Sequence, residues 1–324
     1  MDAESPEKPS LLRRIRLALY GAALNGGIGG IMALVKWLPY GRRQRAGVTI
    51  RRNVAYRDTG MKAHLLDIYR PREAEGPLPV VVYFHGGGFA YLSKDSHWLM
   101  GTLFANHGCV VVNANYRLAP KHRFPAAMED AVSVLEWVGE HMDEIGGDPS
   151  RLVFAGESAG ANLLLGLTLG TCWDREEPLS QRVQATGLVP RAIAPACGML
   201  QVTGTERFAD AGVPQWILDR MAQVSMSYLG PGRATGDVPL ADPLVEVEQA
   251  DSPARPLPAC FVFCGGRDPL LDDSRRLDAA WRALGAESEL RIYDEGHHAF
   301  HALLHKPLAK QAWADQFAFL DHHL

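Results

Sequence analysis

The sequence has few cysteines, and their spacing excludes two classes of small or metal-bound protein. A disulfide framework needs an even, closely spaced set, and a structural zinc site needs paired cysteine or histidine ligands. Neither pattern is present among the 324 residues, which hold no C-x-x-C pair. We therefore expect buried free thiols, no metal and no cofactor. The five cysteines are Cys109, Cys172, Cys197, Cys260 and Cys264.

An excess of basic charge is also missing. Lysine and arginine together number 33 against 37 aspartates and glutamates, so the formal net charge is -4. Proteins that bind a phosphate backbone carry a surplus of basic residues. Because this chain has none, nucleic acid is excluded as a partner. The chain has no internal repeat or low-complexity linker, and its 47% hydrophobic and 22% charged residues are typical of a folded globular protein.

Long hydrophobic runs are absent except near the N-terminus. Leu17–Val35 carries no charge and follows three arginines, which is a membrane signal. However, the run holds five glycines and Asn25, and basic residues follow it as well, so neither a spanning helix nor an orientation is well specified. We favour an element packed on the body of a cytoplasmic protein, without membrane contact. A membrane-associated or exported chain is the alternative.

From about residue 47 onward, short β-rich runs alternate with longer helical patterns. Several runs are almost continuously apolar, which is typical of strands covered on both faces in a parallel sheet. Helical spacing over Ala126–His141 and Leu308–Leu320 supports repeated strand-helix units. Between Cys197 and Asp237 the alternation breaks, and one or two inserted helices are predicted. The predicted strands are Val48–Tyr56, His64–Tyr69, Leu78–Phe84, Cys109–Asn113, Leu152–Ala155, Arg191–Ala196, Ala259–Cys264 and Glu289–Tyr293.

A G-x-S-x-G motif at 156–160 follows an apolar strand and precedes a helical run. This order is typical of a sharp turn that lifts a serine above the edge of a sheet, with glycines where side chains would clash. Ser158 would then lie at a helix N-terminus, where backbone amides face developing negative charge. Ser158 is the predicted nucleophile.

A second motif, His85-Gly-Gly-Gly-Phe89, follows another apolar strand. Consecutive glycines let backbone amides approach a ligand, so the loop can stabilise an oxyanion. A phosphate-binding loop is less favoured, since neither its Gly-Lys-Ser/Thr ending nor a G-x-G-x-x-G spacing is present. His85 is expected to organise the loop and not to act as a base.

A serine nucleophile requires an imidazole and a carboxylate. Asp268 follows the strand after the insertion and is the candidate acid. Asp272 and Asp273 begin the next helix, where we expect cap and dipole residues. After the last strand three histidines compete for the role of base, at positions 297, 298 and 301.

Together these motifs resemble the hormone-sensitive lipase family of α/β-hydrolase carboxylesterases over about residues 60–324. The resemblance is carried by HGGGF at 85–89, NYRLAPKHRFPAAMED at 115–130, GESAG at 156–160, GGRDPLLDD at 265–273 and GHHAF at 296–300. It implies an α/β-hydrolase fold, with a mostly parallel eight-stranded sheet flanked by helices and a helical cap. The cap would comprise residues 1–45 and 197–237, and the body residues 46–196 and 238–324.

The resemblance also implies residue roles. It makes Ser158 the nucleophile, Asp268 the acid and His298 the base, because the family histidine stands two positions before an aromatic residue. His297 is the close alternative. The oxyanion donors would be the amides of three residues, which are Gly87, Gly88 and Ala159. Glu157 departs from the aspartate that is commoner in this family's elbow, and its hydrogen bonding is left open.

The predicted function is a metal-independent serine carboxylesterase for short to medium acyl esters of small molecules. One alternative is a non-catalytic small-molecule receptor on the same fold, which the presence of His297 and His298 disfavours. Another is amide, lactone or acyl-transfer chemistry with the same triad, because fold and triad do not separate these reactions. The sequence determines neither the physiological substrate nor the oligomeric state.

Overall fold

The computed structural model describes residues 26, 27, 29–211 and 213–324. Within them, eight strands form one sheet in the order β1-β2-β4-β3-β5-β6-β7-β8. The pairs β1/β2 and β2/β4 are antiparallel, and all other neighbouring pairs are parallel. This confirms the predicted fold class, and every predicted strand overlaps an observed one. The strands are β1 (Val48–Ala55), β2 (Leu65–Pro71), β3 (Leu78–Phe84), β4 (Val110–Ala114), β5 (Gly147–Glu157), β6 (Ala192–Ala196), β7 (Ala259–Gly265) and β8 (Ser288–Tyr293).

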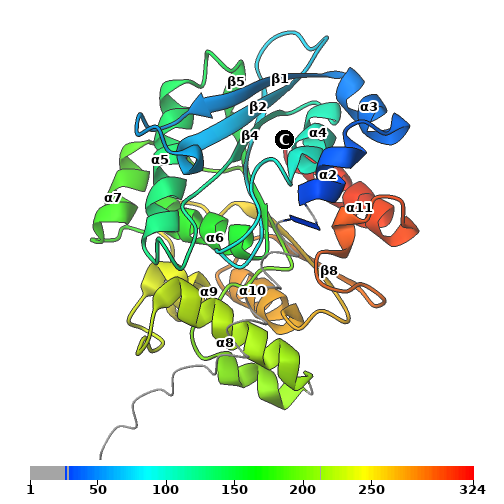
Figure 1. Cartoon of the computed structure of the whole chain (residues 1–324). Coiled ribbons are helices and arrows are strands. Elements are labelled where there is room, and N and C mark those ends of the chain that lie inside the picture. The colour runs from blue at the N-terminus through cyan, green and yellow to red at the C-terminus, as the bar shows by residue number, and fades with distance from the viewer. Residues whose placement is uncertain (1–25, 28, 212) are drawn as a thin grey trace, which may run out of the picture.

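Helices cover both faces of the sheet (Figure 1). The α-helices of the described chain are α2 (Gly29–Val35), α3 (Pro39–Ala46), α4 (Trp98–Asn106), α5 (Ala126–Glu140), α6 (Ala159–Cys172), α7 (Pro178–Ala185), α8 (Gln215–Leu229), α9 (Pro243–Gln249), α10 (Leu271–Ala283) and α11 (Pro307–His323). Short 3-10 turns are η2 (Lys62–His64), η3 (Thr205–Ala211), η4 (Pro239–Ala241) and η5 (Phe300–Ala302).

Strand β3 shows why the central strands are apolar throughout. Val80, Val82 and Phe84 pack into one apolar cluster with α5, α6 and α10. Val81 and Tyr83 pack into a second cluster with α4 and α11. Successive side chains of a strand point to opposite faces, so a strand covered on both sides has no position for a polar residue. The parallel strands all end at one edge, where the predicted site residues lie.

The insertion between β6 and β7 forms η3, α8, η4 and α9. Helix α8 packs on the glycine loop after β3, where the rings of Phe89 and Tyr228 stack with centroids 3.7 Å apart. The expected inserted helices are therefore present, and one of them lies directly over a predicted site loop.

The described N-terminal part lies elsewhere. Helices α2 and α3 lie beside α4, whereas α8 lies at the bottom of the view (Figure 1). The Trp98 indole Nε1 donates a hydrogen bond of 3.0 Å to the carbonyl of Met32. Residues 1–25, more than half of the predicted cap segment 1–45, lie outside the described residues, as does the first part of the apolar run. None of the helices in the described residues combines the length and the apolar character that a membrane-spanning helix needs.

Candidate active site

Ser158 stands alone between β5 and α6, in a sharp turn. Its backbone has φ 52° and ψ -113°, a conformation that non-glycine residues rarely adopt and that is typical of strained functional turns. The turn brings α6 close to β3: a Cβ on Gly160 would lie 2.0 Å from the carbonyl oxygen of Phe84. Only glycine fits this approach, which explains the second glycine of the motif.

Asp268 follows the end of β7 and His298 follows the end of β8, and both lie near Ser158. The distance from Ser158 Oγ to His298 Nε2 is 3.2 Å, and that from His298 Nδ1 to Asp268 Oδ2 is 2.9 Å. With Nδ1–H donating to the carboxylate, Nε2 is the acceptor for the serine hydroxyl. Asp268 is buried, and the His298 side chain is 39% exposed, so the imidazole is open to an incoming molecule.

The three histidines that competed in the sequence are separated in space. His298 faces Ser158, as described above. His297 is exposed, and its carbonyl accepts a hydrogen bond from the amide of Phe300. His301 is buried, and its Nε2 lies 2.9 Å from Glu157 Oε2. The structure therefore brings only His298 to Ser158 among the three.

The electrostatics of His298 are governed by its carboxylate partner. Burial by itself lowers the pKa of His298, but the adjacent Asp268 outweighs burial and holds this pKa well above its ordinary value near 6.5. A nearby negative charge favours the imidazolium, which is the form the ring takes after it accepts a proton. The pair is therefore built to stabilise a proton at Nε2.

The glycine loop supplies the amides that the sequence predicted as donors. Gly87 has φ 117°, and a Cβ there would lie 2.2 Å from the carbonyl oxygen of Tyr91, so no other residue fits. Within the described chain, the amides of Gly87 and Gly88 donate to no protein group. Ala159 is the first residue of α6, where amides lack helical acceptors. A Cβ on Gly88 would lie 3.0 Å from Val224, so α8 closes over this loop.

His85 organises the same loop. Its ring stacks on Tyr116 with centroids 4.3 Å apart, and its Nδ1 lies 2.7 Å from the carbonyl oxygen of Gly86. Burial lowers the pKa of His85 to about 3, so the ring is neutral at physiological pH. These contacts agree with the structural role expected for this residue.

Glu157, the residue before Ser158, lies between two imidazoles. His97 Nε2 lies 2.7 Å from Glu157 Oε1, and His301 Nε2 lies 2.9 Å from Oε2. Burial would raise the pKa of Glu157, but both imidazoles oppose it, and the net result is a pKa well below the ordinary value. Sequence analysis missed His97 completely. A histidine just before a helix gave no signal, because its partner lies 60 residues away.

Cys197 is a second residue that sequence analysis did not place near the site. Cys197, Asp268 and His298 are the one set of metal-ligand type found among the described residues, with ligand atoms within 4.8 Å of one another. Burial raises the pKa of the Cys197 thiol, so it is protonated at neutral pH. Asp268 and His298 already bond to each other. The set is thus part of the Ser158 site and not a separate centre.

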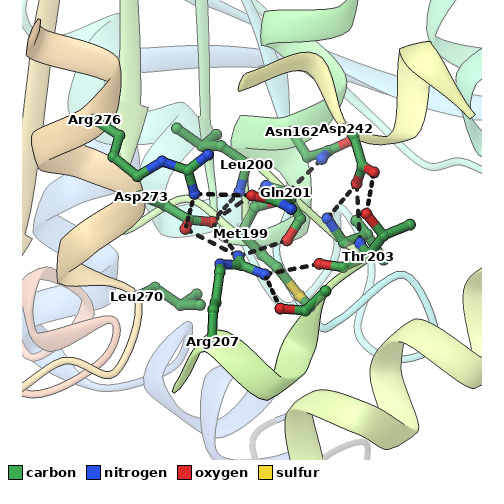
Figure 2. Close-up of polar contacts among 12 residues, drawn as sticks. Asn162, Met199, Leu200, Gln201, Thr203, Arg207, Asp242, Leu270, Asp273 and Arg276 are labelled. Carbon is green, nitrogen blue, oxygen red and sulfur yellow. Dashed lines mark hydrogen bonds and ion pairs between the residues drawn. The ribbon is translucent and has the colours of Figure 1, made fainter. Parts of the chain in front are cut away.

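Two buried carboxylates hold the loop that follows β6 (Figure 2). Asp273 accepts hydrogen bonds from the amides of Leu200 and Gln201 and from the guanidinium of Arg207. Asp242 accepts from the amides of Val202 and Thr203.

This loop begins beside the nucleophile turn, because the amide of Met199 donates to the carbonyl of Ser158. Arg207, on η3, belongs to the insertion. Asp273 therefore joins the insertion, the loop and α10. Asp273 lies in the first turn of α10, where a dipole residue was expected, but it is not the cap, because the residue at the N-cap is Leu270. Its carboxylate is fully buried and bonds to the loop and to Arg207.

Comparison with known proteins finds relatives that are named as esterases. Residues 81–302 match the model of a family described as alpha/beta hydrolase fold. Carboxylesterase NlhH of Mycobacterium tuberculosis is 32% identical over 225 residues, which are 69% of this chain and 66% of the relative. The match thus spans just under two thirds of that relative's length.

Solved structures share the fold over almost the whole chain. A bacterial heroin esterase superposes with a TM-score of 0.78 at 24% identity, over 96% of this chain and 92% of its own. Esterase LipW from Mycobacterium marinum superposes with a TM-score of 0.72 at 25% identity, over 94% and 90%.

Proposed function

Because the chain belongs to the α/β-hydrolase family, in the hormone-sensitive lipase branch that its motifs indicated, we propose that it is a serine carboxylesterase for short to medium acyl esters. The observation that carries the proposal is the hydrogen-bonded series from Ser158 Oγ through His298 to Asp268, at 3.2 and 2.9 Å. The named esterases among its relatives support the same reaction class.

The reaction proceeds through an acyl-enzyme. Ser158 Oγ attacks the ester carbonyl while His298 Nε2 takes the hydroxyl proton, and Asp268 stabilises the resulting imidazolium. The tetrahedral oxyanion accepts hydrogen bonds from the amides of Gly87, Gly88 and Ala159. The imidazolium then protonates the departing alkoxide, which leaves as the alcohol. Water, activated by His298, releases the acid and regenerates the serine.

We assign residues 1–45 and 197–237 as cap, and residues 46–196 and 238–324 as body. The packing of α8 on the Phe89 ring and beside Gly88 supports the second cap piece. Since the oxyanion loop lies directly under this helix, its side chains limit the room for the substrate. The substrate is a small molecule, and we place the enzyme in the cytoplasm, consistent with five buried cysteines that are all free.

The first test replaces the nucleophile. Ser158→Ala should lower turnover of chromogenic esters by about a millionfold, because no other group takes the place of Oγ. Ser150→Ala, at an exposed serine bonded to Asp148, is the matched control and should keep full activity. A panel of esters of increasing acyl length, with the matched anilides, separates ester from amide chemistry.

A serine-reactive phosphonate completes the experiment. It should label wild type at Ser158 and leave the Ser158→Ala variant unlabelled. Tight ester binding without turnover or labelling in the wild type would contradict the enzyme and favour a receptor. Anilide turnover that exceeds ester turnover would favour an amidase.

A further inference from the structure

The N-terminal helices present an apolar surface that the proposed reaction does not use. Five large hydrophobic side chains between positions 31 and 40 are exposed, half of the ten such side chains found in the described part of the chain. A concentration of exposed apolar side chains within ten residues is a mark of a surface that binds something. The five are Ile31 at 62% exposure, Leu34 at 62%, Trp37 at 66%, Leu38 at 46% and Tyr40 at 42%.

The same segment differs sharply in charge from the rest of the molecule. Residues 8–57 contain eleven lysines and arginines and no aspartate or glutamate. All other residues together hold 22 basic and 37 acidic side chains. The chain is thus a strongly acidic body joined to one basic segment, and its overall net charge of -4 conceals this separation. Charge asymmetry of this kind is typical of binding to an anionic surface.

Two arginines bring the basic charge next to the apolar side chains. Arg42 and Arg43 are exposed on α3, two and three residues after Tyr40. Neither pairs with a carboxylate anywhere in the described ranges, in contrast to Arg51, which lies 2.8 Å from Glu144. Their charges are therefore available to an external anion. We call these two arginines and the five exposed hydrophobic residues the contact face.

The contact face is held in position by the body. In α2, Met32 and Val35 pack against the apolar cluster that includes α4 and α11. Lys36 lies 5.7 Å from the centroid of the buried Trp98 ring. Figure 1 shows α2 and α3 next to each other at one side of the molecule, outside α4. The helices therefore present one side to the protein and the other to solvent.

We propose that the contact face seats the protein peripherally on an anionic lipid membrane. Aliphatic side chains enter the boundary of the acyl chains, Trp37 and Tyr40 lie at the level of the headgroups, and Arg42 and Arg43 bind lipid phosphates. Nucleic acid would match the charge but would leave Ile31 and Leu34 uncovered. Attachment of this kind needs no spanning helix, and it agrees with an element that packs on the body through its other side.

The location of the protein follows from the lipid chemistry. The cytoplasmic leaflet is the anionic one, so a protein attached there remains on the cytoplasmic side. The acidic body is repelled by the same surface, which orients the molecule with α2 and α3 toward the lipid. This inference concerns binding alone and holds whether or not the chain hydrolyses esters.

Vesicle flotation of the purified full chain tests the proposal. The protein should float with vesicles of equal parts phosphatidylcholine and phosphatidylglycerol at about 0.15 M salt, and much less with pure phosphatidylcholine or at about 1 M salt. Arg42→Gln with Arg43→Gln should weaken binding by about 25-fold, since each basic residue near the surface contributes about fivefold. Leu34→Ser with Trp37→Ser should weaken binding further at high salt, where charge is screened.

Trp216→Ser is the matched control, because Trp216 is 56% exposed but lies on α8, outside the contact face. It should bind vesicles as the wild type does. The proposal would be overturned if Trp216→Ser lost as much vesicle binding as the contact-face variants do. It would also be overturned if the wild type bound neutral vesicles as strongly as anionic ones, or if the full chain failed to float. A dimer in sedimentation that the Trp37 variant abolishes, with no vesicle binding, would assign the face to a second copy. Circular dichroism checks that each variant is folded.

Discussion

At the residue scale, His298 must be neutral before it can accept a proton from Ser158. Asp268 raises the pKa of His298, so the folded enzyme keeps its imidazolium to higher pH than a free imidazole would. We therefore expect kcat/KM to rise with pH through a midpoint above the ordinary value of about 6.5. An unperturbed imidazole would instead give a rise through about pH 6 to 7. A pH profile in the free-enzyme regime measures the midpoint.

The carboxylate of Asp268 is the cause of the raised pKa of His298, and one substitution at this residue tests its effect. Asp268→Asn should move the midpoint downward as well as reduce the rate, because the negative charge that favours the imidazolium is gone. The residual activity of this variant is followed over the same pH range. A midpoint unchanged by the substitution would mean that the titrating group is not His298.

The choice between neighbouring histidines belongs to this scale as well. His298→Ala should lose several orders of magnitude in turnover, since its Nε2 is the atom 3.2 Å from Ser158 Oγ. His297→Ala is the matched control, one position away and exposed, and it should keep most of the activity. The assignment of the base is wrong if the two variants exchange these results.

Not every site residue could be predicted from the sequence. Ser158, Asp268 and His298 each follow a strand, and parallel strands end at one edge, so their order along the chain was informative. The surroundings of Glu157 were not predictable, because His97 lies 60 residues away and its position depends on how the loop after the glycine motif packs. His301 was recognised only as a competitor for the base.

At the element scale, the strands of the sheet and the presence of inserted helices were predictable, whereas the contacts that hold the insertion in place were not. Continuous apolar runs identified β3 and β7, because burial on both faces removes the alternation of polar residues. The insertion carries no such periodicity across its loops. The start of the insertion is held by Asp273, which bonds to Leu200, Gln201 and Arg207. These three residues lie at least 66 positions away from it in the sequence. No local pattern distinguishes this aspartate from its neighbour.

That neighbour offers a direct test. Asp272 and Asp273 both lie in the first turn of α10, but Asp272 is exposed and Asp273 is fully buried. Asp273→Asn should lower the free energy of unfolding by about 2 kcal/mol, because the amide that replaces the carboxylate cannot accept all the hydrogen bonds from Leu200, Gln201 and Arg207. Asp272→Asn should change it by less than about 0.5 kcal/mol. Urea unfolding of both variants gives the comparison, and similar losses would show that the helix terminus, not the buried network, determines the stability.

At the scale of the whole molecule, the chemistry and the N-terminal segment are separable. Ser158, Asp268, His298 and the glycine loop all come from the body, whereas α2 and α3 contact it beside α4, at the indole of Trp98. Deletion of residues 1–46 would uncover Trp98, a fully buried side chain, and expose apolar surface of α4. Burial of a side chain of this size contributes about 3 kcal/mol, so the truncated protein should have a Tm several degrees below that of the full chain.

Turnover by the folded fraction of the truncated protein should not fall in the way that Tm does. Hydrolysis of the smallest acetyl ester is expected to stay close to wild type, because every proposed reacting group is retained. Preference among longer acyl esters should change if the N-terminal segment lines the pocket as a cap. Deletion of residues 1–25 alone is the matched comparison, since it keeps α2, α3 and the hydrogen bond from Trp98 to Met32 and should preserve Tm. Loss of acetyl ester turnover in folded protein of either truncation would place part of the chemistry in the N-terminal segment, and the separation of reaction and segment would then be wrong.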